Sequence, residues 1–375
     1  MMAIVAGFRS SGNSFDRRRG TVLTGNPAQP TVQLDNSRRA LLARHAAWWQ
    51  RKGTLYVEPS HAPLGKLWLP LAGGKTATED LDLLPHMLDQ ERILGPSLEP
   101  GPLEVIGDVI CVRQVYGTVP WMEAILGCPI RATIQGGSMR TRSFVKDWAE
   151  WDSRTPRKNA DWLKALLQLT EGLVARSGGR YAVAQTLMRG PSDLAEAVLG
   201  PELMCLSMYD HPRALQRFLE EVTEAFIEVL QAQLSRIPPI EGGYVNPFGV
   251  WAPGTVVRTQ CDASAFLSPA QYANWFLPYD ARICEAVDYG IIHLHSGSLH
   301  TVDALLSVER PQAIQVTLDP ESSAPPVEEL LPIFRQVLRV KPLIVDGPLT
   351  REQVQLLRDE LPPDGLYISA RQGSW

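Results

Sequence analysis

The sequence predicts an α/β protein built as a single (β/α)₈ barrel with an irregular N-terminal insertion or cap. Short runs rich in β-branched residues alternate with longer amphipathic runs, which is typical of βα units around a parallel sheet. Eight such short runs occur, which is the number a closed barrel requires. The length of 375 residues suits one barrel with insertions, since roughly 250 residues are typical and more than about 400 occur.

The expected strands are short and apolar, and several become polar toward their carboxyl ends. They are Thr54–Glu58, Glu104–Ile110, Tyr181–Leu187, Val256–Ala263, Ile291–Ser296, Ala313–Asp319, Pro342–Asp346 and Gly365–Ala370. In a parallel barrel the carboxyl ends of the strands meet at the active-site face. The polar residues at these ends are therefore candidates for a functional site.

Helices are expected between the strands. His211–Leu234 carries apolar residues at helical spacing, and Pro212 marks its start. Ser268 and Thr350 are each followed three residues later by glutamine, which predicts two capping boxes.

Two segments interrupt the alternation of strands and helices. Residues from about Leu67 to Lys158 are rich in Pro, Trp and Gly, and we expect them to form the insertion or cap. Residues before about Asp35 have no periodic apolar positions, so we expect them to be poorly ordered and to contribute little to stability. Residues 36–375 would then form one barrel domain.

Composition narrows the class of protein. Apolar residues make up 45% and charged residues 21%, as in soluble globular proteins. The net charge is -5 and no long basic block occurs, so nucleic acid and anionic membranes are poor partners. No apolar run is long enough to predict a membrane span. The 5 cysteines include no C-x-x-C pair, which favours reduced thiols and a cytoplasmic location.

His293 and His295 are the strongest candidates for a metal site. Residues i and i+2 of a strand point to the same side, and at the carboxyl end of a barrel strand that side is the pocket. Two neighbouring imidazoles suit zinc or iron. The alternative is a pair of hydrogen-bonding histidines that contact an anionic ligand. His300 is expected at the surface of the following helix, and His61 in a loop after the first strand.

Three aspartates end expected strands. Asp262 could be a third metal ligand, a general base, or the charge that stabilises a cationic intermediate; otherwise it caps the turn before the next helix. Asp346 is the second catalytic candidate, and Asp319 is a further one; each is alternatively a turn residue. Cys261 alternates away from Asp262 and is expected in the core.

Four segments occur in an order that is typical of one enzyme family. They are G-T-V-P-W-M-E-A-I-L-G-C-P-I at Gly117–Ile130, R-G-P-S-D-L-A-E-A-V-L-G at Arg189–Gly200, C-D-A-S-A-F-L-S-P-A-Q-Y-A-N-W-F-L-P-Y at Cys261–Tyr279 and H-L-H-S-G at His293–Gly297. Their order resembles the uroporphyrinogen decarboxylase superfamily, which includes corrinoid methyltransferases. The resemblance covers roughly Gly117 to Ala370 and implies a (β/α)₈ barrel, in agreement with the strand pattern.

The resemblance implies one of two chemistries. Uroporphyrinogen decarboxylases use no metal, bind a carboxylate-rich tetrapyrrole with arginines, and stabilise the protonated pyrrole with an aspartate. Corrinoid methyltransferases bind zinc through an H-x-C pair and a later cysteine, and the zinc activates a thiol that accepts the methyl group. This sequence departs from both: His295 replaces the metal cysteine, Ser369 stands near the place of the later cysteine, and Arg113–Tyr116 only faintly resembles the R-Q-A-G-R-Y segment of the decarboxylases.

The leading hypothesis is a metal-assisted, methyltransferase-like enzyme that acts on a small thiol or oxygen substrate. His293 and His295 would hold zinc or a similar ion, and Asp262 or a water would complete the site. A corrinoid partner protein is implied by the resemblance alone.

Two alternatives remain open. The first is a decarboxylase-like lyase with a carboxylate-rich substrate, for which Arg113, Arg189 and Arg258 are scattered candidates for binding carboxylates. The second is a barrel that binds a ligand without converting it, since fold alone does not establish catalysis.

Overall fold

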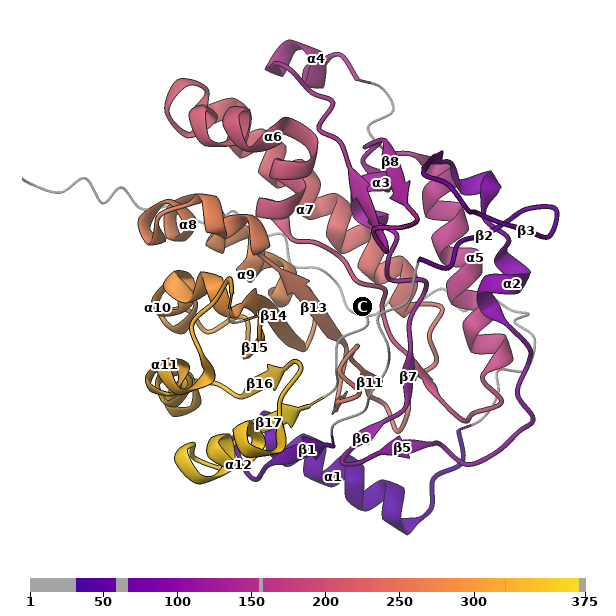
Figure 1. Cartoon of the computed structure of the whole chain (residues 1–375), viewed down its shortest axis with the longest axis vertical. Helices are drawn as coiled ribbons and strands as arrows, with labels where there is room; N and C mark the ends of the chain where they lie inside the picture. Colours follow the sequence, from indigo (N-terminus) through magenta and orange to yellow (C-terminus); the bar gives the residue numbers. More distant parts are fainter. Residues whose placement is uncertain (1–31, 59–66, 155–157, 321, 371–375) are drawn as a thin grey trace, which may run out of the picture.

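The largest sheet has six parallel strands in the order β1-β17-β16-β15-β14-β13 (Figure 1). The computed structural model describes residues 32–58, 67–154, 158–320 and 322–370. Within this sheet the strands are β1 (Leu55–Val57), β13 (Val256–Gln260), β14 (Tyr289–His295), β15 (Ala313–Thr317), β16 (Leu343–Asp346) and β17 (Leu366–Ser369). Their side chains are mostly buried on both faces, as expected for parallel strands, and six of the expected strands are confirmed in type and place.

The strand register arranges the inner face of the sheet in rows. Neighbouring parallel strands in register project paired side chains to the same face. The row nearest the carboxyl ends contains His295, Thr317, Asp346, Ser369 and Val57. The next row contains Gln260, His293, Gln315, Ile344, Tyr367 and Leu55.

Helices lie along the outside of this strand arc, as Figure 1 shows. They are α8 (Pro269–Trp275), α9 (Leu277–Glu285), α10 (Val302–Leu306), α11 (Val327–Val340) and α12 (Arg351–Glu360). The capping boxes predicted at Ser268 and Thr350 are both confirmed. Each hydroxyl accepts a hydrogen bond from the backbone N–H of the third helical residue, a glutamine, and the side chain of that glutamine accepts from the backbone N–H of the capping residue.

A second, separate pair of parallel strands consists of β7 (Val112–Arg113) and β10 (Ala182–Val183). The main sheet has edges at β1 and β13, so among the described residues the expected closure of eight strands into one ladder is not seen. Side-chain and loop bonds bridge these edges instead. Gln185 Nε2 donates to Arg258 O at 2.8 Å and Gln185 Oε1 accepts from Arg258 N at 3.0 Å. On the other edge, Asp108 N donates to Tyr56 O at 2.9 Å.

The prediction of one strand over Glu104–Ile110 is wrong. This segment is an antiparallel hairpin of β5 (Val105–Ile106) and β6 (Val109–Ile110). Gly107 has φ +58°, which an L side chain rarely adopts, so the chain turns there. The parallel strand of this region is β7, which begins two residues after the hairpin.

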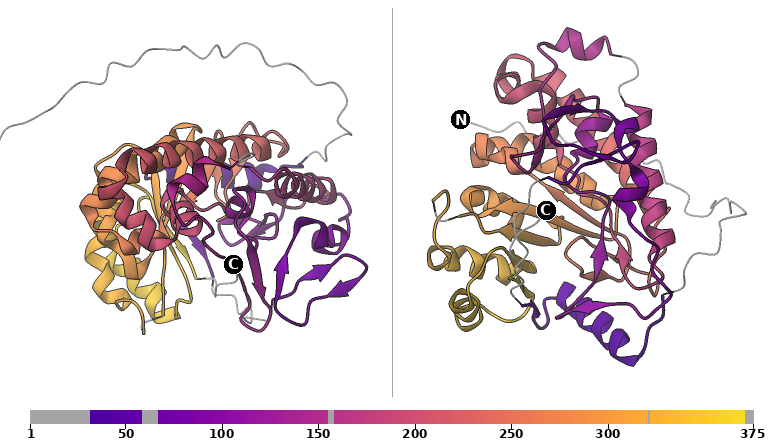
Figure 2. Two further views of the ribbon diagram at one scale, coloured as in Figure 1. Left: turned by 90° about the horizontal axis from the view of Figure 1, so that it is seen from above. Right: turned by 45° about the vertical axis from the view of Figure 1, so that its right-hand side comes forward.

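The region expected to be an irregular cap contains regular antiparallel strands. It includes a pair, β2 (Pro70–Leu71) and β3 (Lys75–Thr76), and a three-stranded sheet of β4 (Leu81–Leu83), β8 (Ile130–Thr133) and β9 (Ser138–Thr141). Its short helices are η1 (Pro85–Met87), α2 (Gln90–Leu94), α3 (Trp121–Ile125) and α4 (Trp148–Asp152). Figure 2 shows these strands on the opposite side of the molecule from β15–β17.

Three longer helices connect the two sides: α5 (Ala160–Arg176), α6 (Pro191–Asp210) and α7 (Pro212–Leu234). The predicted helix at His211–Leu234 is confirmed as α7, whose apolar stripe is buried. Helix α6 bends at Gly200, where φ is +80° and a proline follows.

The amino ends of the strands are covered by α1 (Asn36–Trp49) and the antiparallel pair β11 (Tyr244–Val245) and β12 (Trp251–Ala252). Trp48 of α1 belongs to one buried apolar cluster with Ile344 and Tyr367. Among the described residues no helix is long and apolar enough to cross a membrane. The segment before residue 32 lies outside the described residues, so its expected lack of order stays a prediction.

Candidate metal centre

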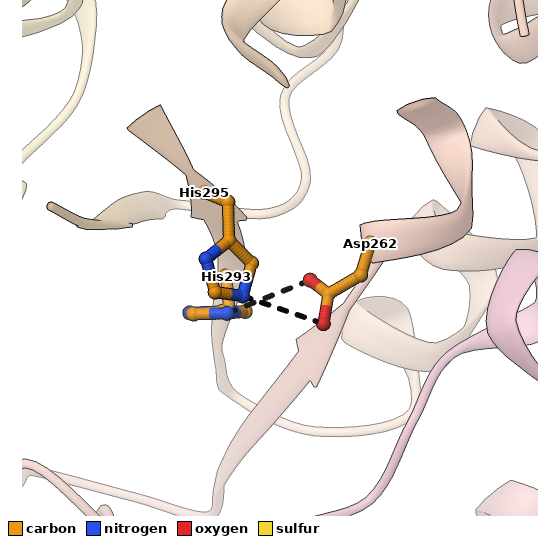
Figure 3. A group of neighbouring side chains, drawn as sticks. All are labelled: Asp262, His293 and His295. Carbon is orange, nitrogen blue, oxygen red and sulfur yellow. Dashed lines mark ion pairs between the residues drawn. The ribbon is translucent and has the colours of Figure 1, made fainter. Parts of the chain in front are cut away.

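Asp262, His293 and His295 come together at the carboxyl ends of β13 and β14 (Figure 3). The two histidines end β14, and their ring centroids lie 4.8 Å apart with the rings nearly perpendicular at 83°. Asp262 begins the 3₁₀ helix η2 (Asp262–Phe266), which follows β13. One nitrogen of each imidazole and one carboxylate oxygen all lie within 4.8 Å of one another. This is a group of donors that one metal ion could bind.

The carboxylate of Asp262 faces both imidazoles. His293 Nε2 lies 3.5 Å from Asp262 Oδ1, and His295 Nε2 lies 3.6 Å from Asp262 Oδ2. Asp262 Oδ1 is buried and has no hydrogen-bond partner among the described residues. A buried carboxylate oxygen without a partner is unfavourable, so this oxygen is suited to a cation.

The far side of each imidazole is held by an oxygen. His293 Nδ1 pairs with Gln315 Oε1, and His295 Nδ1 lies 2.7 Å from Asp319 Oδ1. Because these partners accept, each Nδ1 carries a proton. In the neutral form of each ring, the lone pair of Nε2 therefore faces Asp262. Metal-binding histidines are oriented in this way by outer carboxylates and carbonyls.

Asp262 also has an orienting partner. Gln260 Nε2 donates to Asp262 Oδ2 at 2.7 Å and to Asp193 Oδ2 at 2.8 Å, while Gln260 Oε1 accepts from an NH₂ group of Arg258. Asp193 lies in the first turn of α6, and its Oδ1 accepts from Ala263 N at 2.7 Å. The start of α6 is therefore connected to the segment that carries Asp262.

Gly190, directly before α6, permits this connection. Its N–H donates to Gln260 O at 3.1 Å. A Cβ at this position would collide with that oxygen and lie 2.9 Å from Asp280 Oδ1. Only glycine lets the start of the helix approach β13 so closely.

The electrostatics of the three groups differ. Burial raises the pKa of Asp262, but the hydrogen bond with His295 and the charges of His295 and Arg258 together lower this pKa to about 2. The hydrogen bond with Asp262 raises the pKa of His295 to about 9, with burial acting against it and Asp319 supporting it. Burial lowers the pKa of His293 to about 3, so its imidazole is neutral at neutral pH.

A cavity of about 220 Å³ opens beside the three residues. Its walls come from both sides of the molecule, because β9 of the cap contributes Ser138 and Met139. The lining residues are Gly117, Thr118, Ser138, Met139, Leu187, Arg189, Arg258, Gln260, Asp262, His293, His295 and Thr317. The lining is mostly polar and charged, and Met139 and Leu187 are its large apolar members.

Two of the three arginines that seemed scattered in the sequence meet in this cavity. Arg189 forms an ion pair with the buried Glu123 at 3.0 Å, and this carboxylate raises the pKa of Arg189. Burial lowers the pKa of Arg258 to about 10, which leaves it charged at neutral pH. Arg113 lines a different cavity and stacks over the ring of Tyr181 at 4.5 Å.

The remaining sequence candidates occupy different positions. Asp346 ends β16 in the same row as His295, and its charge favours the protonated form of Arg258, but it is not one of the residues that line the cavity. Cys261 is buried in the core, and burial raises its pKa. His61 lies outside the described residues.

His300 is exposed, as expected, but it also makes contacts. It lies in the 3₁₀ helix η3 (Ser296–Thr301), and its Nε2 lies 3.1 Å from Ser264 O and 3.0 Å from Leu267 O. It thereby connects the segment after β14 to the segment that carries Asp262.

Sequence reasoning missed Gln260 and Gln315, which orient Asp262 and His293. Both are polar residues in buried strands that begin with apolar residues, V-V-R-T-Q and A-I-Q-V-T. Such residues at alternate positions in a buried strand were an available signal. Asp193 had no such signal, because its role depends on where α6 begins in space.

No protein-family model matches the chain, and a search of the curated proteins finds no match either. Among solved structures, a methyltransferase from Methanosarcina mazei is similar, with a TM-score of 0.51 and 12% identity over 70% of this chain and 74% of that chain. At this identity the likeness shows a shared fold alone. The shared fold agrees with the α/β fold expected from the sequence, and the link to uroporphyrinogen decarboxylases is not shown.

Proposed function

We propose that this protein is a metal-assisted transferase that moves a methyl or similar small group to or from a small thiol or oxygen substrate. One observation carries the proposal: a ring nitrogen of His293, a ring nitrogen of His295 and a carboxylate oxygen of Asp262 lie within 4.8 Å of one another, and Asp262 Oδ1 has no hydrogen-bond partner among the described residues. Two imidazoles and one carboxylate form a common ligand set for zinc or iron, and they leave coordination positions open. The donor chemistry therefore fits such an ion.

The residues around the three ligands have distinct tasks in this proposal. Gln315 and Asp319 hold the two imidazoles in the binding orientation. A bound ion would favour the deprotonated form of a thiol or hydroxyl substrate. Met139 and Leu187 provide apolar walls that exclude water from the reacting group. Asp346 remains the second catalytic candidate, through its charge on Arg258.

The source of the methyl group is also part of the proposal. The sequence resembles corrinoid methyltransferases, and the fold is similar to that of a methyltransferase. A corrinoid partner protein would therefore be the donor or acceptor of the group.

We further propose that the strand arc and the β7–β10 pair work as one distorted (β/α)₈ barrel. The side-chain bonds of Gln185 to the backbone of Arg258 support this at one edge. Asp108, which bonds Tyr56 through its backbone and its carboxylate, supports it at the other edge.

Elemental analysis tests the proposed metal. Wild-type protein should purify with close to one zinc or iron per chain, and His293→Ala should remove it, because two donors rarely hold such an ion against water. His211→Ala is the matched control, because His211 is an exposed histidine at the end of α6. Wild-type protein without bound metal, after expression in metal-supplemented medium, would contradict the proposal.

A second function is favoured by the two arginines in the cavity. Arg189 and Arg258 beside Asp262 would suit a decarboxylase-like lyase with a carboxylate-rich substrate. This alternative predicts metal-free protein that binds small tricarboxylates saturably, with weaker binding in His293→Ala. Calorimetric titration of the metal-free protein with citrate separates it from the transferase.

A further inference from the structure

The side-chain amide of Gln260 has one favourable orientation. Its Oε1 accepts from Arg258, which can only donate. Its Nε2 donates to Asp262 Oδ2 at 2.7 Å and Asp193 Oδ2 at 2.8 Å. The reversed amide would place an oxygen against the carboxylate of Asp262 and an NH₂ group against the guanidinium. Arg258 therefore acts together with the two carboxylates to determine which end of Gln260 meets Asp262.

We propose that Gln260 is a positioning residue that makes Asp262 a one-oxygen ligand, and that Arg258 acts through Gln260 and not on the substrate. The inference rests on the proposed metal site. Because Gln260 binds Oδ2, the free oxygen of Asp262 is Oδ1, which lies 3.5 Å from His293 Nε2. Without the amide, the carboxylate would be free to rotate about its last bond.

The two arginines of the cavity differ in a way that supports this assignment. Arg258 is only 2% exposed, and its backbone N–H and carbonyl are both bonded to the side chain of Gln185. Arg189 has 34% of its side chain exposed and lines the same cavity. Arg189 is the cation that a substrate can reach, and Arg258 is a buried residue that holds Gln260 beside the proposed metal ligands.

The direction in which metal affinity changes when Arg258 is removed shows whether Arg258 orients Gln260 or acts only through its positive charge. Removal of a positive charge near a cation site ordinarily tightens cation binding, because like charges repel. If Arg258 orients Gln260, its removal should weaken metal binding despite this electrostatic gain. Removal of Arg189 should leave metal binding equal or tighter.

The test measures the dissociation constant for Zn²⁺ by competition with a chromophoric chelator. Gln260→Met and Arg258→Met should each weaken Zn²⁺ binding about tenfold or more, the effect expected for a partner that orients a ligand. The double variant should have about the same Zn²⁺ affinity as the single variant that binds less tightly. Both changes interrupt the same series of hydrogen bonds, from Arg258 through Gln260 to Asp262. Arg258→Lys, which keeps a donor and the charge, should restore part of the affinity.

Two matched controls use the same chemical changes elsewhere. Arg189→Met removes the other cation of the cavity. Gln312→Met makes the same substitution as Gln260→Met at the opposite end of the sheet, where Gln312 Oε1 accepts from Gly290 N at 2.6 Å and Nε2 donates to Asp288 O at 2.7 Å. Neither control should weaken Zn²⁺ binding.

Unchanged affinity in Gln260→Met, or tighter binding in Arg258→Met, would overturn the positioning role while leaving the metal site intact. If Arg258→Met fails to fold, as judged by its circular dichroism melting curve, Gln260→Met and Arg258→Lys decide the matter. Wild-type protein that does not bind Zn²⁺ would refute the proposed function itself, and the inference with it.

Discussion

One row across the sheet is polar on one side of the molecule and apolar on the other. Gln260, His293 and Gln315 occupy this row on β13, β14 and β15. Ile344 and Tyr367 continue it on β16 and β17. All five side chains are buried, so burial alone does not decide which kind of residue the fold accepts.

The two halves satisfy burial by different means. In the apolar half, Tyr367 packs in the cluster that includes Ile344 and Trp48, and its hydroxyl donates to Phe248 O at 3.1 Å. In the polar half, side chains bond one another, yet Asp262 Oδ1 and Arg258 Nε still lack partners among the described residues. The apolar half therefore contributes to stability, and in the proposed function the polar half holds the ligand.

The largest expected effect lies in the apolar half. Tyr367→Ala should lower the free energy of unfolding by about 3–5 kcal/mol, because it removes a buried aromatic ring and leaves a cavity. It should change the affinity for Zn²⁺ by no more than about threefold, since Tyr367 lies on β17, and β15 and β16 separate this strand from β14, which carries His293 and His295. Urea unfolding and chelator competition measure the two quantities.

Phe266→Ala is the control for this prediction, because Phe266 is 57% exposed and its loss should change the free energy of unfolding by only about 0.5 kcal/mol. A large loss of Zn²⁺ affinity in Tyr367→Ala would show that the two halves of the row are not independent.

A histidine in each region allows a second, smaller test of the comparison. His45 of α1 is fully buried; its Nδ1 accepts from Trp251 N at 2.9 Å, and its Nε2 lies 2.7 Å from Asp108 O, to which it donates. Burial lowers the pKa of His45 to about 4, against the ordinary 6.5. His295 has its pKa raised to about 9 by its carboxylate partners. The apolar region therefore keeps His45 neutral, whereas the carboxylates of the polar region favour the charged form of His295.

The sign of the pH effect follows from this lowered pKa. Between pH 6.5 and pH 4 the unfolded state binds a proton at His45 that the folded state does not, so stability falls as pH falls through this window. The loss should reach about 3 kcal/mol by pH 4, at about 1.4 kcal/mol per pKa unit. His45→Gln should lack this part of the pH dependence in urea unfolding, and the exposed His211→Gln should retain it. Equal slopes for wild type and His45→Gln would contradict the prediction.

The polar and apolar halves also differ in how far the sequence predicts them. Strands β13 to β17 were predictable because each contains a short run of apolar, mostly β-branched residues, which is typical of a buried parallel strand. The candidates Asp262, His293 and His295 followed from their place at strand ends. The row itself was not predictable, because register depends on pairing between strands that are distant in sequence.

One wrong prediction and one omission have identifiable physical causes. The strand expected over Glu104–Ile110 fails because Gly107 turns the chain into a hairpin. The contribution of Asp193 was hidden because it is 69 residues from Asp262 in sequence and reaches it only through Gln260. Contacts of this kind depend on where a helix begins relative to a sheet, which apolar periodicity does not encode.

The smallest expected effect concerns the outer partner of His295. Asp319 Oδ1 lies 2.7 Å from His295 Nδ1, and Asp319 Oδ2 accepts from Gly297 N at 3.2 Å, so the carboxylate is itself held in place. Asp319→Asn keeps an oxygen that can accept from the imidazole but removes the negative charge that makes the ring a better donor to a metal. We expect Zn²⁺ to bind about tenfold more weakly, equivalent to about 1.4 kcal/mol, with little change in the unfolding curve of the metal-free protein. Asp303→Asn, which removes a carboxylate bonded to Gln336 on the outer helices, is the matched control and should bind Zn²⁺ as wild type does. If Asp319→Asn binds Zn²⁺ with wild-type affinity, the orientation of His295 does not depend on this carboxylate. The proposed contrast between a stabilising half and a ligand-binding half of the row would then rest on Gln260, His293 and Gln315 alone.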